Sequence, residues 1–366
     1  MNIFVNNPIQ ATIIFSSLLL VSILVSIRFR KAEAPLSQNV SQELKGVAIL
    51  LVVISHIGYF LASDTRFLFP LSIAAGVGVN MFLLLSGYGL TISSSKSNDG
   101  ILQNYRRRLG KLYVPMWISV LIFVILDFFL IKKSYSWQYL FNTAIGYFPG
   151  LNLYGDLNSP LWYFTLIIFY YLILPLVFFK KYPWISAIII YLASYLIVSD
   201  PPSLITGVAH MYKIHLIAFP LGIILAWLLG KTWTINLIDK IKSSSNWLIR
   251  ILLVLVASAI AIYTAVHSNI GLGIKEELTS IITVLSLLLV FIIKKISFRT
   301  LYWIGFFSYE IYLLHWPIMY RHDFLYKFMP SWLATALYFV VLIAFAWLLQ
   351  RITELILKRK TAEIKK

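Results

Sequence analysis

Apolar stretches long enough to cross a lipid bilayer recur along the whole of this chain. Of its 366 residues, 60% are hydrophobic and only 12% are charged, and the mean hydropathy is +0.84. A helix needs about 20 apolar residues to span a membrane, and it satisfies its backbone hydrogen bonds without water. We therefore predict an all-α integral membrane protein with about eleven transmembrane helices in one bundle. The predicted helices are residues 9–27, 43–62, 70–92, 112–131, 160–179, 184–199, 210–229, 247–266, 277–293, 301–319 and 332–351.

The distribution of basic residues predicts the orientation of these helices. The net charge is +17, but the basic residues fall in short runs between apolar stretches and form no patch interleaved with aromatic side chains. This pattern is typical of membrane topology, so nucleic acid is not an expected partner. If the N-terminus is outside, most of the 31 lysines and arginines lie on the cytoplasmic side, as the positive-inside rule requires. We expect a multi-pass protein of the plasma (inner) membrane, in contact with lipid, with its C-terminus cytoplasmic.

The remaining features of the chain limit where chemistry can take place. Residues 9–27 have no basic residue before them and no small-residue cleavage pattern after them, which favours an uncleaved first span over a signal peptide. The amphiphilic segment 137–150 can be re-entrant or interfacial. There is no cysteine, which excludes disulfides and thiolate chemistry. Since no linker or soluble domain is visible, any reaction is expected within the bundle or at its faces.

Several ionisable side chains fall inside the predicted helices. His56 lies about 16 Å beyond Lys45 on a helix that runs outward, which places it near the middle of the membrane. Glu310 and His315 fall on the tenth predicted helix, and Lys213 falls on the seventh. A single buried histidine most often satisfies a neighbouring polar group, but several ionisable groups at similar depth favour a shared polar cavity.

A basic cluster lies at the cytoplasmic end of the fourth predicted helix. The stretch "NYRRRLGKLYVPMW" contains Arg106, Arg107, Arg108 and Lys111. Most such clusters set topology and contact lipid headgroups. They also suit a phosphorylated cytoplasmic ligand, because guanidinium groups bind phosphate through paired hydrogen bonds. Both interpretations stay open. The sequence has no Walker loop, Rossmann glycine pattern, HExxH or GxSxG motif.

Five short motifs follow one another in a recognisable order. Ten residues separate Lys45 from His56, and the other four motifs are "NMFLLLSGYGL", "RRRLGKLYVP", "PLWYFTLIIFYYLILPL" and "SYEIYLLHWPI". Over residues 41–350 the chain thereby resembles the membrane-bound acyltransferase 3 family, the O-acyltransferases of bacterial surface polysaccharides. The resemblance implies transfer of an acyl group, usually acetyl from cytoplasmic acetyl-CoA. The implied acceptor is a hydroxyl of a cell-surface glycan, a lipid-linked saccharide or a related molecule on the outer face.

The chain also departs from the pattern of this family. Lys111 occupies the second position of the family's basic RxxR pair, which keeps the charge but loses the bidentate geometry of arginine. No acidic residue follows Trp162 in its helix, although some members carry one there. The resemblance divides the chain into residues 1–40, an additional transmembrane helix and basic cytoplasmic loop; 41–351, the acyltransferase 3 membrane domain; and 352–366, a basic cytoplasmic tail.

The resemblance implies roles for single residues. His56 is the expected base or transient acyl carrier, because imidazole can accept a hydroxyl proton or an acyl group near neutral pH. Glu310 is expected to orient His56 or balance its charge, and His315 to line the same pocket. No metal is expected. The acyl-CoA-binding residues are expected to be Lys45, Arg106, Arg107, Arg108 and Lys111, and the acceptor-binding residues Ser86, Trp162, Lys213 and His215.

Two other classes of function compete with acyl transfer. A transporter or flippase for a lipid-linked saccharide suits eleven helices around a polar cavity. It gives no reason, however, for a phosphate-binding cluster near a buried histidine, and no inverted repeat is visible. A sensor or assembly partner with the same fold and no activity is the third class. The acceptor, the acyl group and the oligomeric state stay open at this point.

Overall fold

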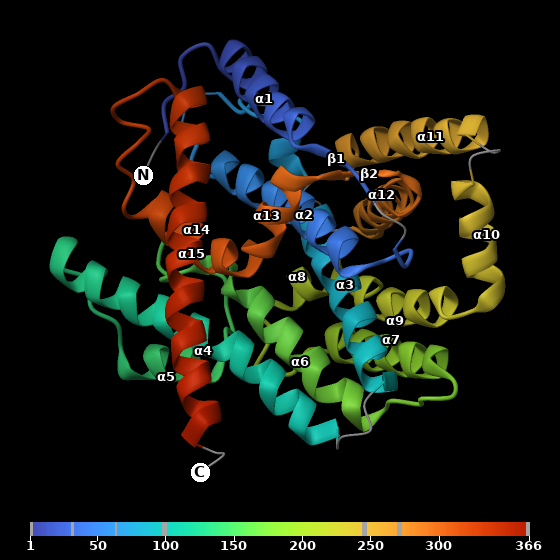
Figure 1. Cartoon of the computed structure of the whole chain (residues 1–366). Coiled ribbons are helices and arrows are strands. Elements are labelled where there is room, and N and C mark those ends of the chain that lie inside the picture. Colours follow the sequence, from blue (N-terminus) through green and yellow to red (C-terminus); the bar gives the residue numbers. More distant parts are fainter. Residues whose placement is uncertain are drawn as a thin grey trace.

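The protein is described by a computed structural model over residues 3–30, 33–62, 64–96, 101–243, 247–268 and 273–363, without the side chains of 101–107 and 358–363. Within these ranges helices form almost the whole fold (Figure 1). The helices are α1 (Pro8–Val25), α2 (Gln38–Gly58), α3 (Ala75–Lys96), α4 (Ile101–Leu130), α5 (Trp137–Ile145), α6 (Trp162–Leu176), α7 (Pro183–Ser199), α8 (Ala209–Lys213), α9 (Ala218–Leu229), α10 (Thr232–Lys242), α11 (Trp247–Val266), α12 (Ile274–Ile293), α13 (Arg299–Phe306), α14 (Ser308–Tyr320) and α15 (Ser331–Glu363). Two short strands, β1 (Ile27–Phe29) and β2 (Ile296–Phe298), and two 3₁₀ turns, η1 (Leu71–Ile73) and η2 (Ser159–Leu161), complete it.

Nine helical segments in the described ranges are long and apolar enough to cross a membrane. This finding confirms the all-α membrane fold, with fewer long helices than the eleven predicted. One reason is that α7 has only 17 residues. Another is that the predicted helix 301–319 is divided at Phe307 into α13 and α14. The predicted helix 210–229 is still one of the nine segments, although it is interrupted between α8 and α9, where Pro220 in the first turn of α9 has no N–H to continue the helix.

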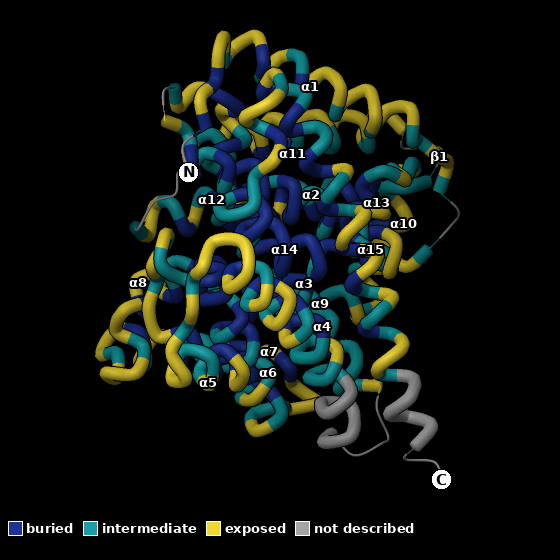
Figure 2. Tube along the Cα trace, turned by 90° about the vertical axis from the view of Figure 1, so that its left-hand side faces the viewer, coloured by how far each residue is buried: buried dark blue, intermediate teal, exposed yellow. Residues whose placement is uncertain are grey.

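The centre of the bundle consists of α2, α3 and α14. Figure 2 shows buried residues gathered around these helices, whereas α1 at the edge is largely exposed. In the apolar window of α2, 67% of the residues are buried, against 11% in α1. Apolar side chains gain nothing from burial when the surroundings are lipid, so an exposed apolar helix is stable at the periphery. His56, Asn80 and His315, discussed below, lie on these central helices.

Glycines allow the central helices to approach their neighbours closely. A Cβ atom on Gly46 of α2 would overlap the backbone carbonyl of Leu301 in α13, and one on Gly305 would overlap that of Gln42. The pair α3 and α9 meets in the same way through Gly87 and Gly222. Small residues at helix contacts are the usual means of packing in membranes, where no hydrophobic force drives helices together.

The first helix is fastened to the rest of the domain. The strand β1 that follows α1 pairs antiparallel with β2, with Arg28 opposite Ser297. Next to this pairing, the buried carboxylate of Glu43 accepts hydrogen bonds from Arg30, at 2.9 Å, and from Lys294. A buried carboxylate between two cations requires all three partners. Residues 1–40, predicted as an addition to the family domain, therefore contribute directly to its packing.

The segment after α4 turns back along that helix. Tyr135 donates a hydrogen bond to Asp127 near the end of α4. At the other end of α5, Trp117 Nε1 donates to the carbonyl of Ala144 at 2.7 Å, and the hydroxyl of Tyr113 donates to that of Ile145 at 2.8 Å. Tyr113 lies more than four turns before the end of α4, which is about 25 Å. Residues 137–150 therefore pack along the length of α4, and whether they are re-entrant or interfacial stays a prediction.

Candidate active site

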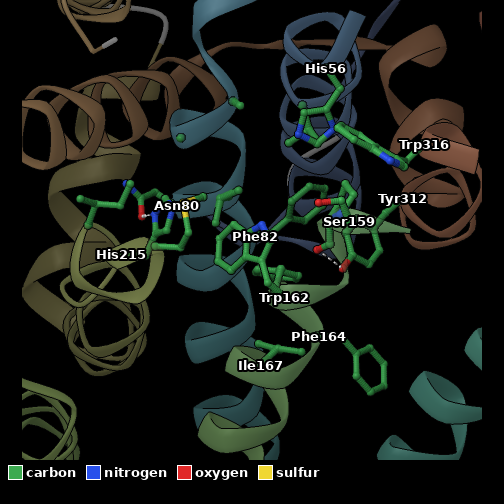
Figure 3. Close-up of a pocket in the computed structure, with 18 of the residues that line it drawn as sticks. His56, Asn80, Phe82, Ser159, Trp162, Phe164, Ile167, His215, Tyr312 and Trp316 are labelled. Atoms are coloured by element: carbon green, nitrogen blue, oxygen red, sulfur yellow. Dashed lines mark hydrogen bonds between the residues drawn. The ribbon is translucent and has the colours of Figure 1, made fainter. Parts of the chain in front are cut away.

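A cavity of about 250 Å³ lies inside the bundle, lined by side chains of α2, α3, α6, α12 and α14. In Figure 3, His56 and Trp316 lie on one side of it and Asn80 and His215 on the other, with Trp162 between them. An interior pocket with a few convergent polar groups is the usual form of a ligand site. Most of the wall between these polar groups is aromatic or aliphatic.

His56 and His315 form a hydrogen-bonded pair at one wall of this cavity. The distance from His56 Nδ1 to His315 Nε2 is 2.7 Å, and the two rings are nearly parallel. His56 is partly accessible and lines the cavity, while His315 is completely buried behind it. The side chain of Trp316 packs edge-on against the His56 ring with a centroid distance of 5.2 Å. The His56 ring is thus held on two sides.

The backbone of α14 determines which nitrogen of His56 can act as a base. Nδ1 of His315 lies 2.8 Å from the carbonyl oxygen of Tyr312, and a carbonyl can only accept a hydrogen bond. The proton of neutral His315 is therefore on Nδ1, so its Nε2 accepts the hydrogen bond from His56 Nδ1. This arrangement leaves the lone pair of His56 on Nε2. The hydroxyl of Tyr338 in α15 donates to the carbonyl of His315 and fixes the backbone at this point.

Glu310 lies elsewhere. The partner that orients His56 is His315, and Glu310 is not among the described residues that line the cavity. The carboxylate of Glu310 is close enough to Lys45 to interact with it electrostatically. The sequence thus correctly put both residues on the tenth predicted helix, but the facing of Glu310 could not be read from it. A role for Glu310 in balancing charge stays a prediction, now centred on Lys45.

A second cavity adjoins the first at Lys45. It measures about 260 Å³ and is lined by the amino-terminal end of α2, by α3 and by Arg108 of α4. Lys45, Ser86 and Tyr171 line both cavities. These shared residues make the two cavities neighbours, with Arg108 at one end and His56 further along α2. His56 itself lies in the last turn of α2, nearer the end of the helix than the predicted range 43–62 placed it.

The structure places the two described members of the predicted basic cluster, Arg108 and Lys111, in different surroundings. Arg108 lines the second cavity, and its guanidinium donates to the carbonyl of Gly89 at 3.4 Å. Lys111 is exposed and is not among the described lining residues of either cavity. The side chains of Arg106 and Arg107 lie outside the described part of the chain. Successive residues of a helix point in different directions, so four neighbouring cations do not all face one pocket.

The wall opposite His56 carries a second histidine. Nδ1 of His215 lies 2.7 Å from Oδ1 of Asn80, whose Nδ2 donates to the hydroxyl of Ser280 at 2.9 Å. The ring of Trp162 stacks on His215 with a centroid distance of 5.7 Å. Both of these predicted acceptor-binding residues line the cavity, as does Ser86. Lys213 does not, because α8 ends at this residue and leaves its side chain exposed.

Several polar lining residues had no role in the sequence-based prediction, and four of them matter for the argument below. They are Asn80, Ser159, Glu276 and Glu277. Glu276 and Glu277 are adjacent acidic residues at the start of an apolar span, a pattern that also occurs at ordinary helix ends. Ser159 is the first residue of the turn η2, directly before Pro160, and has no periodic signal. Of the four, only Asn80 could have been noticed in the sequence, because a side-chain amide is rare inside an apolar stretch.

Comparison with known proteins was made by family, by curated protein and by solved structure. The model of the acyltransferase 3 family, described as "Acyltransferase domain", matches residues 44–351. No significant match was found among curated proteins or solved structures. The matched residues contain His56, His315 and the described side chains that line the first cavity.

Proposed function

This chain belongs to the acyltransferase 3 family, and from that premise we propose that it is a membrane O-acyltransferase. The acyl group that we propose is acetyl. The donor substrate is cytoplasmic acyl-CoA, and the acceptor is a hydroxyl of a cell-surface glycan, a lipid-linked saccharide or a related molecule. The observation that carries this proposal is the position of His56. Its basic nitrogen, Nε2, belongs to a ring on the wall of a cavity that adjoins a second, cation-lined cavity.

The two cavities suit the two substrates in one orientation of the protein. With the N-terminus outside and the C-terminus cytoplasmic, the amino-terminal end of α2 and Arg108 face the cytoplasm, where acyl-CoA is present. Lys45 and Arg108 line the cavity at this end, and cations of this kind bind phosphate groups. Arg106 and Arg107 would add to the attraction. The first cavity then lies toward the outer face of the plasma (inner) membrane and receives the acceptor.

The histidine pair supports direct transfer. The acceptor O–H proton moves to His56 Nε2 while the hydroxyl oxygen bonds to the thioester carbonyl carbon. The carbon–sulfur bond then breaks, and the CoA sulfur takes the proton from Nε2. During this step His56 carries a positive charge, and its Nδ1–H remains bonded to His315. Transient attachment of the acyl group to Nε2 is the two-step variant of the same reaction.

Replacement of His56 tests the proposal. We expect His56→Ala to lower the rate of acceptor acylation by about 10²–10⁴-fold, the usual contribution of a positioned base. The protein should still insert and elute as a folded species in detergent. His267→Ala is the matched control, because His267 is exposed just after α11 and lines neither cavity, and its ring bonds to the carbonyl of Tyr263. Full turnover in His56→Ala would refute the mechanism.

The release of free CoA distinguishes the enzyme from a flippase. An acyltransferase releases one thiol for each acylated acceptor, whereas a flippase for a lipid-linked saccharide releases none. The assay needs purified protein, acetyl-CoA, a saccharide acceptor and a thiol reagent. Thiol release that depends on both acceptor and His56 supports acyl transfer, and saccharide movement without thiol release supports the flippase.

A further inference from the structure

The positive and negative side chains that line the first cavity lie in different parts of it. Lys45 is at the end that adjoins the second cavity, and Glu276 and Glu277 are at the start of α12, where Glu277 accepts a hydrogen bond from Ile217 on the wall that carries His215. Among the described lining residues, Lys45 is the only lysine or arginine. The nearest lysines in sequence to this wall, Lys213 and Lys275, are exposed and not in the lining. The acceptor end of the cavity therefore has carboxylates without a balancing cation.

The two carboxylates have different surroundings. Glu277 is buried, and its Oε1 accepts a hydrogen bond from the N–H of Ile217 at 3.2 Å, which bridges the break between α8 and α9. Glu276 is partly accessible and has no ion-pair partner within the described ranges. Both lie in the first turn of α12, where the helix dipole favours negative charge. Glu276 lines the cavity, and its carboxylate lies close to Gly273 at the start of α12; it is the more accessible of the two carboxylates.

A buried hydroxyl without a partner points to a polar ligand in the same space. Ser159 lines the cavity, is only 3% exposed, and its Oγ makes no hydrogen bond. Figure 3 places it between His56 and Trp162. Almost all buried polar groups in proteins have a partner, so this hydroxyl is available to one that is brought by the substrate. Trp162 next to it offers an aromatic surface to the C–H groups of a sugar ring.

We infer that this site selects acceptors by charge: it binds a neutral or amine-bearing saccharide and rejects saccharides that carry a carboxylate or phosphate near the acylated hydroxyl. The inference rests on the proposed acyl transfer and names its acceptor class. Ser159 hydrogen-bonds the sugar, Trp162 contacts its ring, and Glu276 repels a negative group or pairs with an amine. Like charges brought together in a site of restricted water access repel strongly.

Three methyl glycosides that differ in one group test this inference. Methyl glucoside is neutral, methyl glucosaminide carries an amine, and methyl glucuronide carries a carboxylate. The full chain in detergent is given acetyl-CoA and each sugar at pH 7, and the O-acetyl product is quantified by mass spectrometry. We expect kcat/KM for the glucuronide to be at least about tenfold below that of the glucoside. A shift of the unfolding temperature by each sugar, without acetyl-CoA, reports binding independently of turnover.

Substitution of Glu276 and Glu277 tests whether these carboxylates cause the preference among the three sugars. We expect Glu276→Gln, alone or together with Glu277→Gln, to reduce the discrimination against the glucuronide by at least about threefold. Asp200→Asn is the control, because Asp200 is exposed at the end of α7 and is not in the lining. Ser159→Ala should raise KM for all three sugars and leave the preference unchanged.

Each outcome is decisive. Equal binding and turnover of glucuronide and glucoside would overturn the inference, as would an unchanged preference in the double variant or no binding of any sugar. Binding that follows the predicted order without release of CoA would support the acceptor class and refute acyl transfer instead.

Discussion

The chemistry proposed for His56 depends on a residue that is not among the described residues lining the cavity. His315 lies behind His56, and its own proton is directed by the Tyr312 carbonyl, so the pair has one consistent arrangement of protons. A partner of this kind orients the reactive ring and stabilises the charge that forms on it. It is a positioning residue, and its removal should affect the chemical step more than substrate binding.

Replacing His315 tests this dependence. We expect His315→Ala to lower kcat by roughly 10- to 100-fold, the effect usual for an orienting partner, with KM for acetyl-CoA nearly unchanged. His315→Gln should recover part of kcat, because its side-chain oxygen can accept the proton of His56 Nδ1. Steady-state kinetics of the three proteins provide the measurement. If both variants changed KM alone, His315 would have no part in the chemistry.

Only part of the basic cluster faces a cavity, which gives a second prediction. Arg108→Gln should raise KM for acetyl-CoA by about tenfold or more, since a charged hydrogen bond to phosphate is lost. Lys111→Gln should raise it much less, because Lys111 is exposed and lines neither cavity. The two KM values, measured at a fixed acceptor concentration, make the comparison. An equal effect of the two substitutions would mean that CoA is bound by the surface charge of the whole cluster.

Glycines allow α13 to pack closely against α2. Hydrogen bonds to α4 hold the segment that contains α5, and the chain leads from there to the turn before α6. These bonds bear on the proposed acceptor site, because Leu151, Ser159 and Trp162 all follow α5 in the chain and line the cavity. Arg321, next to the end of α14, fastens this loop by donating to the carbonyl of Asp156 at 2.5 Å and to the carboxylate of Asp127.

Substitution of glycine by alanine shows which contacts are tight. Gly305→Ala should lower the free energy of unfolding by about 1–3 kcal/mol, because the added methyl meets the Gln42 backbone, which cannot move aside like a side chain. Gly89→Ala is the matched control, since a Cβ there meets nothing within 4 Å and alanine favours a helix. Thermal unfolding in detergent measures both. Equal stability of the two variants would contradict the close approach of α2 and α13.

The whole molecule has a proposed orientation that the absence of cysteine makes easy to test. Single cysteines can be introduced at Ser203, which is exposed after α7, and at Asp239, which is exposed on α10. In intact cells a membrane-impermeant maleimide should label Ser203→Cys, because that loop is expected outside, and should label Asp239→Cys only after the membrane is opened. The reverse pattern would invert the topology and place the acceptor end of the cavity in the cytoplasm.

The sequence by itself determined the class of the protein. Long apolar runs can only form membrane helices, and ordered motifs such as Lys45 with His56 identified the family. The lengths of the apolar stretches also placed His56 on one helix, α2, and Glu310 and His315 together on another, α14. They could not give the facing of Glu310, the exposure of Lys213 or the split of the basic cluster.

Only the tertiary structure decided which polar groups share a space. His56 meets His315 across 259 residues of sequence, and His215 meets Asn80 across 135. Contacts of this kind depend on the rotation of each helix and on where it breaks, as at Pro220, and an apolar run contains little information about either. In a membrane a helix that is apolar all round can turn many faces inward at similar cost. The packing of glycines and the few polar side chains select one of them.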